Sequence, residues 1–356
     1  MKPKSPFRAF AGIRPTSQGA LGALFMLLSA VYSLAVRLRL LLYRAGILRV
    51  EKAQGAKVIS IGNLTAGGTG KTPVCILLAR MTGDNTAIVS RGYGRTSDEP
   101  VQVVSDGKTV LEKFPRAADE ALLCARELKT VPVVCAPKRI DGIRAAISVL
   151  GARTVILDDA FSHLAVWRDK NILLVDALDP FGGNRLLPAG RLREPRSSAK
   201  RASAVIITRA GMVNIKELYL LKSEILRDTN PVMEIFTCDI APDAVIGPLG
   251  ASHPAGGFLR GKTAVLVSGI ASPAQFEETV ISLGAEVSDH HMFADHHPFT
   301  AGEIQSIAGG LLRDEILLTT QKDIVRIPEE HLRLFHVLTV RARVREEDKF
   351  RDWLSA

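Results

Sequence analysis

The sequence has little cysteine and no long stretch of low complexity. Four cysteines occur in 356 residues, and no two of them have C-x-x-C spacing. This pattern excludes a disulfide scaffold and a zinc finger, and it fits reduced thiols in a cytosolic compartment. Hydrophobic residues make up 47% of the chain and charged residues 23%. That balance excludes a disordered or fibrous protein, and the length favours about two domains.

Acidic residues are almost absent from the N-terminal segment. Residues 1–52 contain one acid, Glu51, against nine lysines and arginines, so they hold +8 of the net charge of +9. A protein that binds nucleic acid usually spreads its basic residues over the folded domain. We therefore expect no nucleic-acid partner, and we look for a membrane partner instead.

The same segment is the most apolar in the chain. Residues 15–36 contain no charged residue, and their apolar centre at 20–36 is followed by RLRLLLYRAGILR. A 17-residue helix is about 26 Å long, which is just short of a bilayer core of about 30 Å. Leucine mixed with arginine is typical of an amphipathic helix on an anionic membrane surface. We favour an interfacial anchor; the alternatives are a single span, a buried core helix, and a signal peptide cleaved near residues 33–35.

A glycine-rich segment follows the first predicted strand. Residues 57–62 (KVISIG) suit a short buried strand, and NLTAGGTGKT then leads into the helical pattern PVCILLARM. A strand, a glycine-rich loop and a helix in this order form a P-loop, in which backbone N–H groups hold phosphates. Lys71 would reach the β- and γ-phosphates of ATP, and the Thr72 hydroxyl would bind Mg²⁺. The predicted nucleotide-binding residues are Thr65, which replaces the usual first glycine, Ala66, Gly67, Gly68, Thr69, Gly70, Lys71 and Thr72.

Strand-like runs alternate with helical patterns after the P-loop. The runs cover residues 86–90, 131–134, 154–157, 172–175 and 204–208, and helical patterns lie at 119–128 and 139–150. This alternation predicts an α/β fold of the P-loop NTPase type, with a mostly parallel sheet and helices on both faces. Ligands bind at the carboxyl ends of the strands in such a fold.

Charged residues gather where predicted strands end. The strand at 154–157 runs into Asp158 and Asp159, a pair suited to Mg²⁺ or its waters, although a single aspartate there is commonly a helix cap. The loop SRGYGR at 90–95 suits an anion or a sugar, or is simply a turn. LPAGRLREP at 187–195 places Arg193 and Glu194 in a loop bounded by prolines. These two residues are candidates for the site, and a surface ion pair is the alternative.

Seven motifs in order resemble the tetraacyldisaccharide 4′-kinase family: SIGNLTAGGTGKTP, SRGYGR, DE-A-LL, DDAFSH, LLPAGRLREP, DHHPFT and T-x-KD. They extend over most of the chain. The resemblance implies ATP-dependent phosphorylation of the 4′-hydroxyl of a tetraacyl glucosamine disaccharide 1-phosphate, which gives lipid IVA, with Mg²⁺ as the metal. It also implies that the N-terminal helix docks on anionic phospholipid at the cytoplasmic face of the bacterial inner membrane, as a peripheral or monotopic anchor. We expect a monomer.

The resemblance also assigns residue roles. It makes Asp119 the general base, paired with His296, because a carboxylate held against an imidazole can accept the hydroxyl proton. Lys71 is the third catalytic residue, and Arg193 lies near the nucleotide phosphates. The implied Mg²⁺ ligands are Thr72, Asp158, Asp159 and Glu194. The implied lipid-binding residues are Arg91, Tyr93, Glu120, Arg139 and His163.

The chain departs from the family pattern outside these positions. The departures are Ala160, Ser162, Arg191, Ala271, Ser272 and Gln321. Because the phosphate, base and Mg²⁺ positions are intact, we expect an active enzyme. An inactive homologue that only binds is one alternative. A membrane-bound regulatory ATPase is another, since GGTGKT also occurs in septum-site and partition ATPases, but Ala66 replaces their signature lysine.

We predict four segments along the chain: a membrane-associating segment at 1–52, a kinase domain at 53–235, a second, smaller α/β domain with hinge strands at 236–344, and a C-terminal helix at 345–356. The Pro/Gly/Ala-rich stretch at 237–262 predicts a connection, and the strand at 335–344 could pair with 232–238. Asp119 and His296 fall in different predicted domains, so we expect domain closure to bring them together. In DHHMFADHH we favour one functional histidine over a metal site.

Overall fold

The computed structural model describes residues 19–356, so the predicted charges at Lys2, Lys4, Arg8 and Arg14 lie outside the described residues. The chain divides into two compact units. Unit 1 comprises the described part of Met1–Lys71 together with Arg153–Asp239 and Arg343–Ala356, and unit 2 comprises Thr72–Ala152 and Ile240–Ala342. We describe each unit separately.

Unit 1 is built on a parallel sheet in the order β8-β7-β6-β1-β5. Nearly every side chain in β1, β6 and β7 is buried, as expected for parallel strands covered on both faces. The strands are β1 (Lys57–Asn63), β5 (Thr154–Leu157), β6 (Lys170–Asp176), β7 (Ala204–Thr208) and the first part of β8 (Glu234–Ile246). The helices are α1 (Ala20–Arg44), α5 (Ile215–Asp228) and α9 (Glu347–Ser355).

The core of unit 1 lies between this sheet and its helices. Leu173, Val175 and Ile207 pack with Leu221 and Ile225 of α5. A capping box fixes the start of α5, because the Asn214 side chain accepts from the Glu217 N–H and the Glu217 side chain accepts from the Asn214 N–H. The predicted C-terminal helix is present as α9, and it is anchored by Phe350, whose ring lies 4.8 Å from that of Phe236.

Unit 2 contains two groups of strands. In the first, β2 (Thr86–Ser90) pairs in parallel with β4 (Val133–Cys135), and β3 (Gln102–Ser105) pairs antiparallel with β4. Helices α2 (Lys71–Thr82), α3 (Asp119–Glu127) and α4 (Arg139–Ser148) belong to this part of the chain. The sequence analysis missed β3, which pairs antiparallel with β4 and lies at the end of the strand order.

The second group of strands in unit 2 has the order β11-β10-β12-β13-β8. One face is covered by α6 and α7 and the other by α8, because alternate residues of β10 belong to two different core clusters. The elements are α6 (Ala255–Leu259), β10 (Thr263–Ser268), α7 (Pro273–Ser282), β11 (Glu286–Met292), α8 (Ala301–Gly309), β12 (Glu315–Thr320) and β13 (Phe335–Val344). Strands β10, β11 and β12 are parallel, so their carboxyl ends share one edge.

One prediction about this region is wrong. Residues 237–262 are not a plain connection: they contain most of the 13-residue strand β8, the short strand β9 (Ser252–Pro254) and α6. Within β8, Pro242 lies between the stretch that pairs with β7 at 234–238 and the stretch that pairs with β9 at 244–246. Strands β13 and β8 are neighbours, as predicted, but Thr339 of β13 contacts Ala244 of β8, which lies beyond the predicted partner segment 232–238.

Candidate active site

The glycine-rich loop lies between β1 and α2 and is fixed from several sides. Gly67 and Gly70 have φ angles of +115° and +76°, which a residue with a side chain rarely adopts. The Thr208 hydroxyl donates to the Thr69 carbonyl at 3.0 Å, and Arg209 Nη2 donates to the Gly68 carbonyl at 2.8 Å. These contacts hold the loop in one conformation at the carboxyl ends of β1 and β7.

Lys71 and Arg193 both reach Asp159. Lys71 Nζ lies 3.9 Å from Asp159 Oδ2, and the two Nη atoms of Arg193 donate to the Asp159 carboxylate at 3.1 and 2.9 Å. Arg193 Nη2 also donates to the Asn63 carbonyl at 3.0 Å. The structure thus brings together three of the predicted phosphate-site and metal-site residues, and it places two cations beside the glycine-rich loop.

The sequence analysis missed Asn63, Asp176 and Arg209, which lie at or next to strand ends beside the glycine-rich loop. Asn63 ends β1, and its side-chain amide donates to the Thr65 hydroxyl at 3.1 Å. Asp176 ends β6 and binds Arg209 Nη1 at 2.8 Å. Burial raises the pKa of the Asp176 carboxyl, and the charge of Arg209 opposes that effect. Their position at strand ends is the signal that could have found them, since this edge of a parallel sheet is where ligands bind.

The remaining predicted metal ligands of unit 1 are buried oxygen donors. Asp158 and Glu194 are 4% and 2% exposed. Glu194 Oε2 accepts from Arg201 at 2.7 Å, whereas Glu194 Oε1 is buried with no hydrogen-bond partner. Within residues 19–356, no group of three or more His, Cys, Asp or Glu side chains is arranged to hold a metal ion by itself.

Asp119 and His296 form a close pair within unit 2. His296 Nδ1 lies 2.7 Å from Asp119 Oδ2, so the imidazole donates to the carboxylate when its proton is on Nδ1. The side chain of Asp119 is 4% exposed and that of His296 is 48% exposed. An incoming hydroxyl would therefore meet the imidazole first, with the carboxylate behind it. We predicted that domain closure brings the two residues together, and this stays a prediction.

The four histidines of DHHMFADHH have four different acidic neighbours. His290 contacts Glu277 at 2.8 Å, and its Nε2 lies 2.8 Å from the Ser268 hydroxyl, which is fully buried. His291 and His297 lie 3.3 Å from Asp289 and 3.1 Å from Glu303. Of these four, only His296 contacts the first turn of α3.

The predicted lipid-binding residues belong to both units and differ in exposure. Arg91 and Tyr93 are exposed in the loop after β2, with Tyr93 81% exposed, and Glu120 is half-buried beside Asp119 in the chain. Arg139 is 3% exposed and donates to the Ala136 carbonyl at 2.9 Å. His163 is half-buried in unit 1, in the loop after Asp159. Their role as a lipid site stays a prediction.

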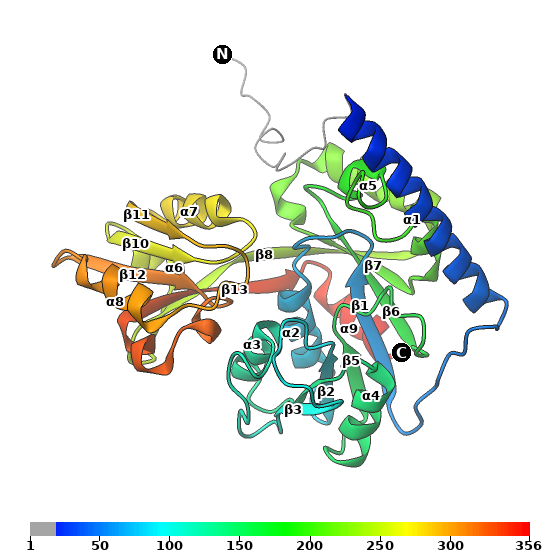
Figure 1. Cartoon of the computed structure of the whole chain (residues 1–356), viewed down its shortest axis with the longest axis horizontal. Coiled ribbons are helices and arrows are strands. Elements are labelled where there is room, and N and C mark those ends of the chain that lie inside the picture. The colour runs from blue at the N-terminus through cyan, green and yellow to red at the C-terminus, as the bar shows by residue number, and fades with distance from the viewer. Residues whose placement is uncertain (1–18) are drawn as a thin grey trace. The chain divides into compact units, whose positions relative to one another are not determined.

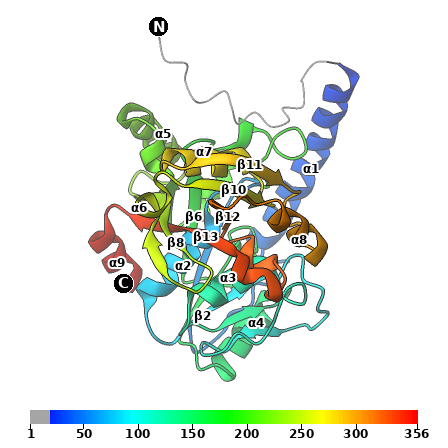
Figure 2. The ribbon, with the colours of Figure 1, turned by 90° about the vertical axis from the view of Figure 1, so that its left-hand side faces the viewer.

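Helix α1 is one unbroken helix in Figure 1 and in Figure 2, and hydrogen bonds attach it to the rest of unit 1. The Tyr32 hydroxyl donates to the Arg193 carbonyl at 2.9 Å, the Ser29 hydroxyl donates to the Leu186 carbonyl at 2.9 Å, and Arg39 donates to the Ser162 carbonyl at 3.0 Å. Burial raises the pKa of the Tyr32 phenol, and the nearby Glu194 adds to the effect.

The outer face of α1 is apolar and exposed. Leu27, Leu34 and Leu41 are 64%, 70% and 60% exposed, and only 6% of the most apolar window of the helix is buried. This exposure contradicts the alternative of a buried core helix. By length and composition α1 is also long enough to cross a membrane.

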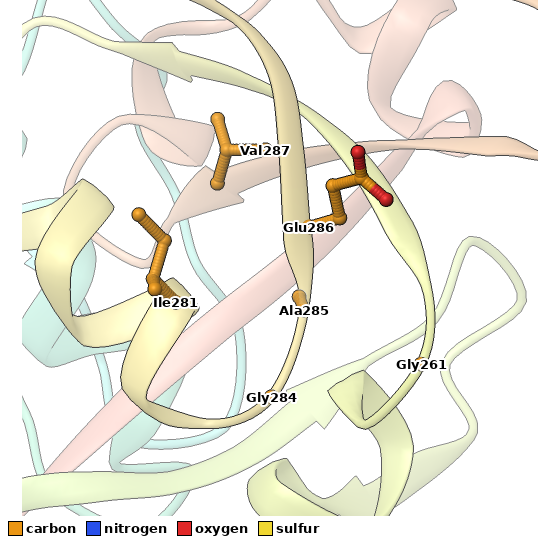
Figure 3. A pocket seen from close by; sticks show the side chains of 6 residues that line it. All are labelled: Gly261, Ile281, Gly284, Ala285, Glu286 and Val287. Carbon is orange, nitrogen blue, oxygen red and sulfur yellow. The ribbon is translucent and has the colours of Figure 1, made fainter.

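The surface hollow in Figure 3 is not part of this chemistry. Its volume is about 570 Å³, and Gly261, Ile281, Gly284, Ala285, Glu286 and Val287 line it. It lies at the amino ends of β10 and β11, whereas His296 follows their carboxyl ends. Its described lining residues include one acid and no cation, so it does not suit a phosphate group.

Comparisons with known proteins agree with the geometry. Residues 21–356 match the family model described as Tetraacyldisaccharide-1-P 4'-kinase. The chain is 38% identical over 356 residues to a tetraacyldisaccharide 4'-kinase of Desulfatibacillum aliphaticivorans, covering 96% of this chain and 94% of the relative. It is 40% identical over 326 residues to that of Anaeromyxobacter sp. (strain K), covering 88% and 84%.

A solved structure is similar as well. The crystal structure of LpxK from Aquifex aeolicus in complex with ATP superposes with a TM-score of 0.76 at 28% identity. The match covers 94% of this chain and 98% of that one.

Proposed function

The chain belongs to the tetraacyldisaccharide-1-P 4'-kinase family, and from this premise we propose how its two groups of site residues divide the reaction. It is an ATP-dependent kinase that transfers a phosphoryl group to a sugar hydroxyl of a lipid A precursor. The observation that carries this function is the family match over residues 21–356. The glycine-rich loop and the 2.7 Å contact between Asp119 and His296 support it.

The phosphates of ATP are proposed to lie on the glycine-rich loop of unit 1. Phosphoryl transfer needs positioning and charge neutralisation more than covalent chemistry. The backbone N–H groups of the loop supply dipoles, and Lys71 and Arg193 supply two cations that Asp159 already holds in place. An ATP phosphate would take over part of the role that the Asp159 carboxylate fills in this structure.

The oxygen donors of unit 1 fit Mg²⁺. Mg²⁺ is usually held by one or two carboxylates and by substrate phosphates, rather than by an all-protein cage. The buried Glu194 oxygen that lacks a hydrogen-bond partner and the buried Asp158 at the end of β5 match this requirement. When bound, the ion would neutralise charge on the β- and γ-phosphates. Thr72 and Asp159 stay predicted ligands on the basis of their motifs.

The Asp119–His296 pair is proposed to accept the proton of the sugar hydroxyl. A general base must lie within hydrogen-bond reach of that proton. The half-exposed imidazole can meet the hydroxyl, while the buried carboxylate orients the ring through Nδ1 and stabilises the positive charge that the ring gains. The two residues therefore act as one unit.

A direct assay tests the function. The purified chain, supplied with ATP and tetraacyldisaccharide 1-phosphate in detergent micelles, should produce a lipid that is heavier by one phosphate. Nuclear magnetic resonance should place that phosphate on the 4′ oxygen. A regulatory ATPase would instead hydrolyse ATP without modifying the lipid, and an inactive homologue would bind both compounds unchanged.

Helix α1 is proposed to bring the enzyme to the cytoplasmic face of the inner membrane. Its apolar outer face can enter the interface between headgroups and acyl chains, and its arginines can contact anionic phospholipid. The Tyr32 hydrogen bond joins the helix to the segment that carries Arg193. A lipid substrate could then reach the site without leaving the membrane.

Three negative charges introduced on the outer face of α1 should release the enzyme from the membrane. Burial of a leucine contributes about 1.5–3 kcal/mol, so Leu27→Glu, Leu34→Glu and Leu41→Glu together should move most of the protein to the soluble fraction. We expect a higher KM for the lipid and an unchanged KM for ATP. Wild-type protein should leave membranes more completely in detergent than in high salt.

A matched variant controls for added charge. Val149, Leu249 and Leu312 are also exposed, at 72%, 87% and 71%. Three glutamates at these positions should leave the fractionation unchanged. If the α1 variant stays with the membrane and keeps its lipid kinetics, the anchor proposal is wrong.

A further inference from the structure

Arg326 is a buried arginine to which the mechanism above gives no role. It ends the short turn Ile324–Arg326 that follows β12, and its side chain is 0% exposed. A buried guanidinium costs free energy unless its charge and its N–H groups find partners. The groups that Arg326 contacts therefore indicate its role in the structure.

Two of its contacts are to backbone carbonyls next to His296: that of His297, the following residue, and that of Gly269, which also accepts from the His296 N–H. Arg326 Nη2 donates to the Gly269 carbonyl at 2.9 Å, and Nη1 donates to the His297 carbonyl at 3.1 Å. The Gly269 carbonyl also accepts from the His296 N–H at 3.0 Å. His296 has a φ angle of +63°, an uncommon conformation for histidine that persists only when its surroundings impose it. Arg326 is one of the groups that impose it.

A third contact reaches the other half of the pair. Arg326 Nε lies 3.6 Å from Asp119 Oδ2, the same oxygen that faces His296 Nδ1. Nε has no hydrogen-bond partner, so Asp119 is the acid that this side of the guanidinium faces. Nη2 also pairs with Asp323, which is fully buried. Burial raises the pKa of the Asp323 carboxyl, and the charge of Arg326 is the largest effect that opposes it.

We propose that Arg326 is a positioning residue for the Asp119–His296 pair. Through Gly269 and His297 it fixes the backbone that aims the imidazole, and through Nε it stabilises the negative charge of a carboxylate that water hardly reaches. Arg326 does not touch the substrate. This inference rests on the proposed role of the pair as the proton acceptor.

The inference predicts an effect on turnover and not on nucleotide binding. Arg326→Gln removes the charge, whereas Arg326→Lys keeps a charge and loses the planar fork. We expect Arg326→Gln to lower kcat by at least about 10-fold, a part of the roughly 10²–10⁴-fold contribution of a general base, and Arg326→Lys to fall between it and wild type. The KM for ATP should stay within about 2-fold.

A double-mutant cycle separates this role from a merely structural one. In the Asp119→Asn, His296→Ala background, Arg326→Gln should change the remaining turnover by less than about 2-fold, because the pair through which it acts is gone. Thr339→Val is the matched control: it removes the buried hydrogen bonds of Thr339 with Ala244 and should lower the Tm without lowering kcat. If Arg326→Gln does not fold, the same double-mutant cycle is measured with Arg326→Lys.

The outcomes distinguish this inference from the function on which it rests. Unchanged kcat in Arg326→Gln, or an equal proportional loss in both backgrounds, overturns the role of Arg326 and leaves the pair intact. Full turnover in Asp119→Asn overturns the base itself, and the role of Arg326 falls with it.

Discussion

Lys71→Ala should lose phosphoryl transfer by roughly 10²–10³-fold or more, which is the usual effect of removing one preorganised donor from a developing negative charge. Lys71 Nζ lies 3.4 Å from the Gly67 carbonyl and 3.5 Å from Asn63 Oδ1, so it already lies over the glycine-rich loop. The measurement is kcat with ATP and the lipid, together with the Tm.

The fold should tolerate this change. Lys71 begins α2, and alanine is the best helix former, so the Tm should stay close to that of wild type. Lys200→Ala, an exposed lysine of unit 1 made alanine in the same way, should leave kcat unchanged. Near wild-type turnover in Lys71→Ala would contradict the placement of phosphates on this loop.

The sequence predicts the glycine-rich loop because its chemistry is local. A strand, a run of glycines and a helix start lie within a few residues of one another, and backbone N–H groups need no distant partner to hold a phosphate. The supports of the loop are not local: Thr208, the last residue of β7, and the next residue, Arg209, are 139 and 141 positions from the loop residues that they contact. Strand order is not encoded in the spacing of residues, so these supports could not be predicted.

The strand prediction is wrong where the composition of a strand resembles that of a connection. The stretch 237–262 is rich in proline and glycine, as connections are, yet β8 continues into it because β7, β9 and β13 supply pairing partners that lie elsewhere in the sequence. Arg326 shows a second limit. Nothing in the local pattern marks it, and its importance appears only when β10, β11 and β12 bring Gly269, His297 and Asp323 to one edge.

Asp119 and His296 were paired by resemblance, since 177 positions separate them. The structure adds a physical reason for the pairing: a buried carboxylate faces a half-exposed ring. An alternative role for Asp119 is a purely structural one, as a cap of its helix. The N-cap of α3 is Ala118, which makes no side-chain cap, and Asp119 Oδ1 accepts from the Glu120 N–H at 2.9 Å. Asp119 thus serves the first turn of the helix with one oxygen and His296 with the other.

The Asp119→Asn variant uses this division. Asparagine keeps an oxygen for the Glu120 N–H, so the helix start, worth about 1 kcal/mol, should survive and the Tm should stay unchanged. The negative charge beside the imidazole is lost, and kcat should fall by about 10²–10⁴-fold with little change in affinity for ATP. Asp106→Asn is the matched control, because Asp106 likewise accepts backbone hydrogen bonds but lies in a different loop.

His296→Ala should lower kcat by the same order as Asp119→Asn, and the double variant should fall little further, because removing either member already disables the unit. His291→Ala, which removes a partly exposed histidine paired with Asp289, should leave kcat unchanged. Multiplied losses in the double variant would mean that the two residues act separately. Retained turnover in Asp119→Asn would remove the carboxylate from the mechanism and leave Asp119 as a structural residue of α3. That variant keeps the oxygen for the helix and loses both the charge and the oxygen that accepts from the imidazole.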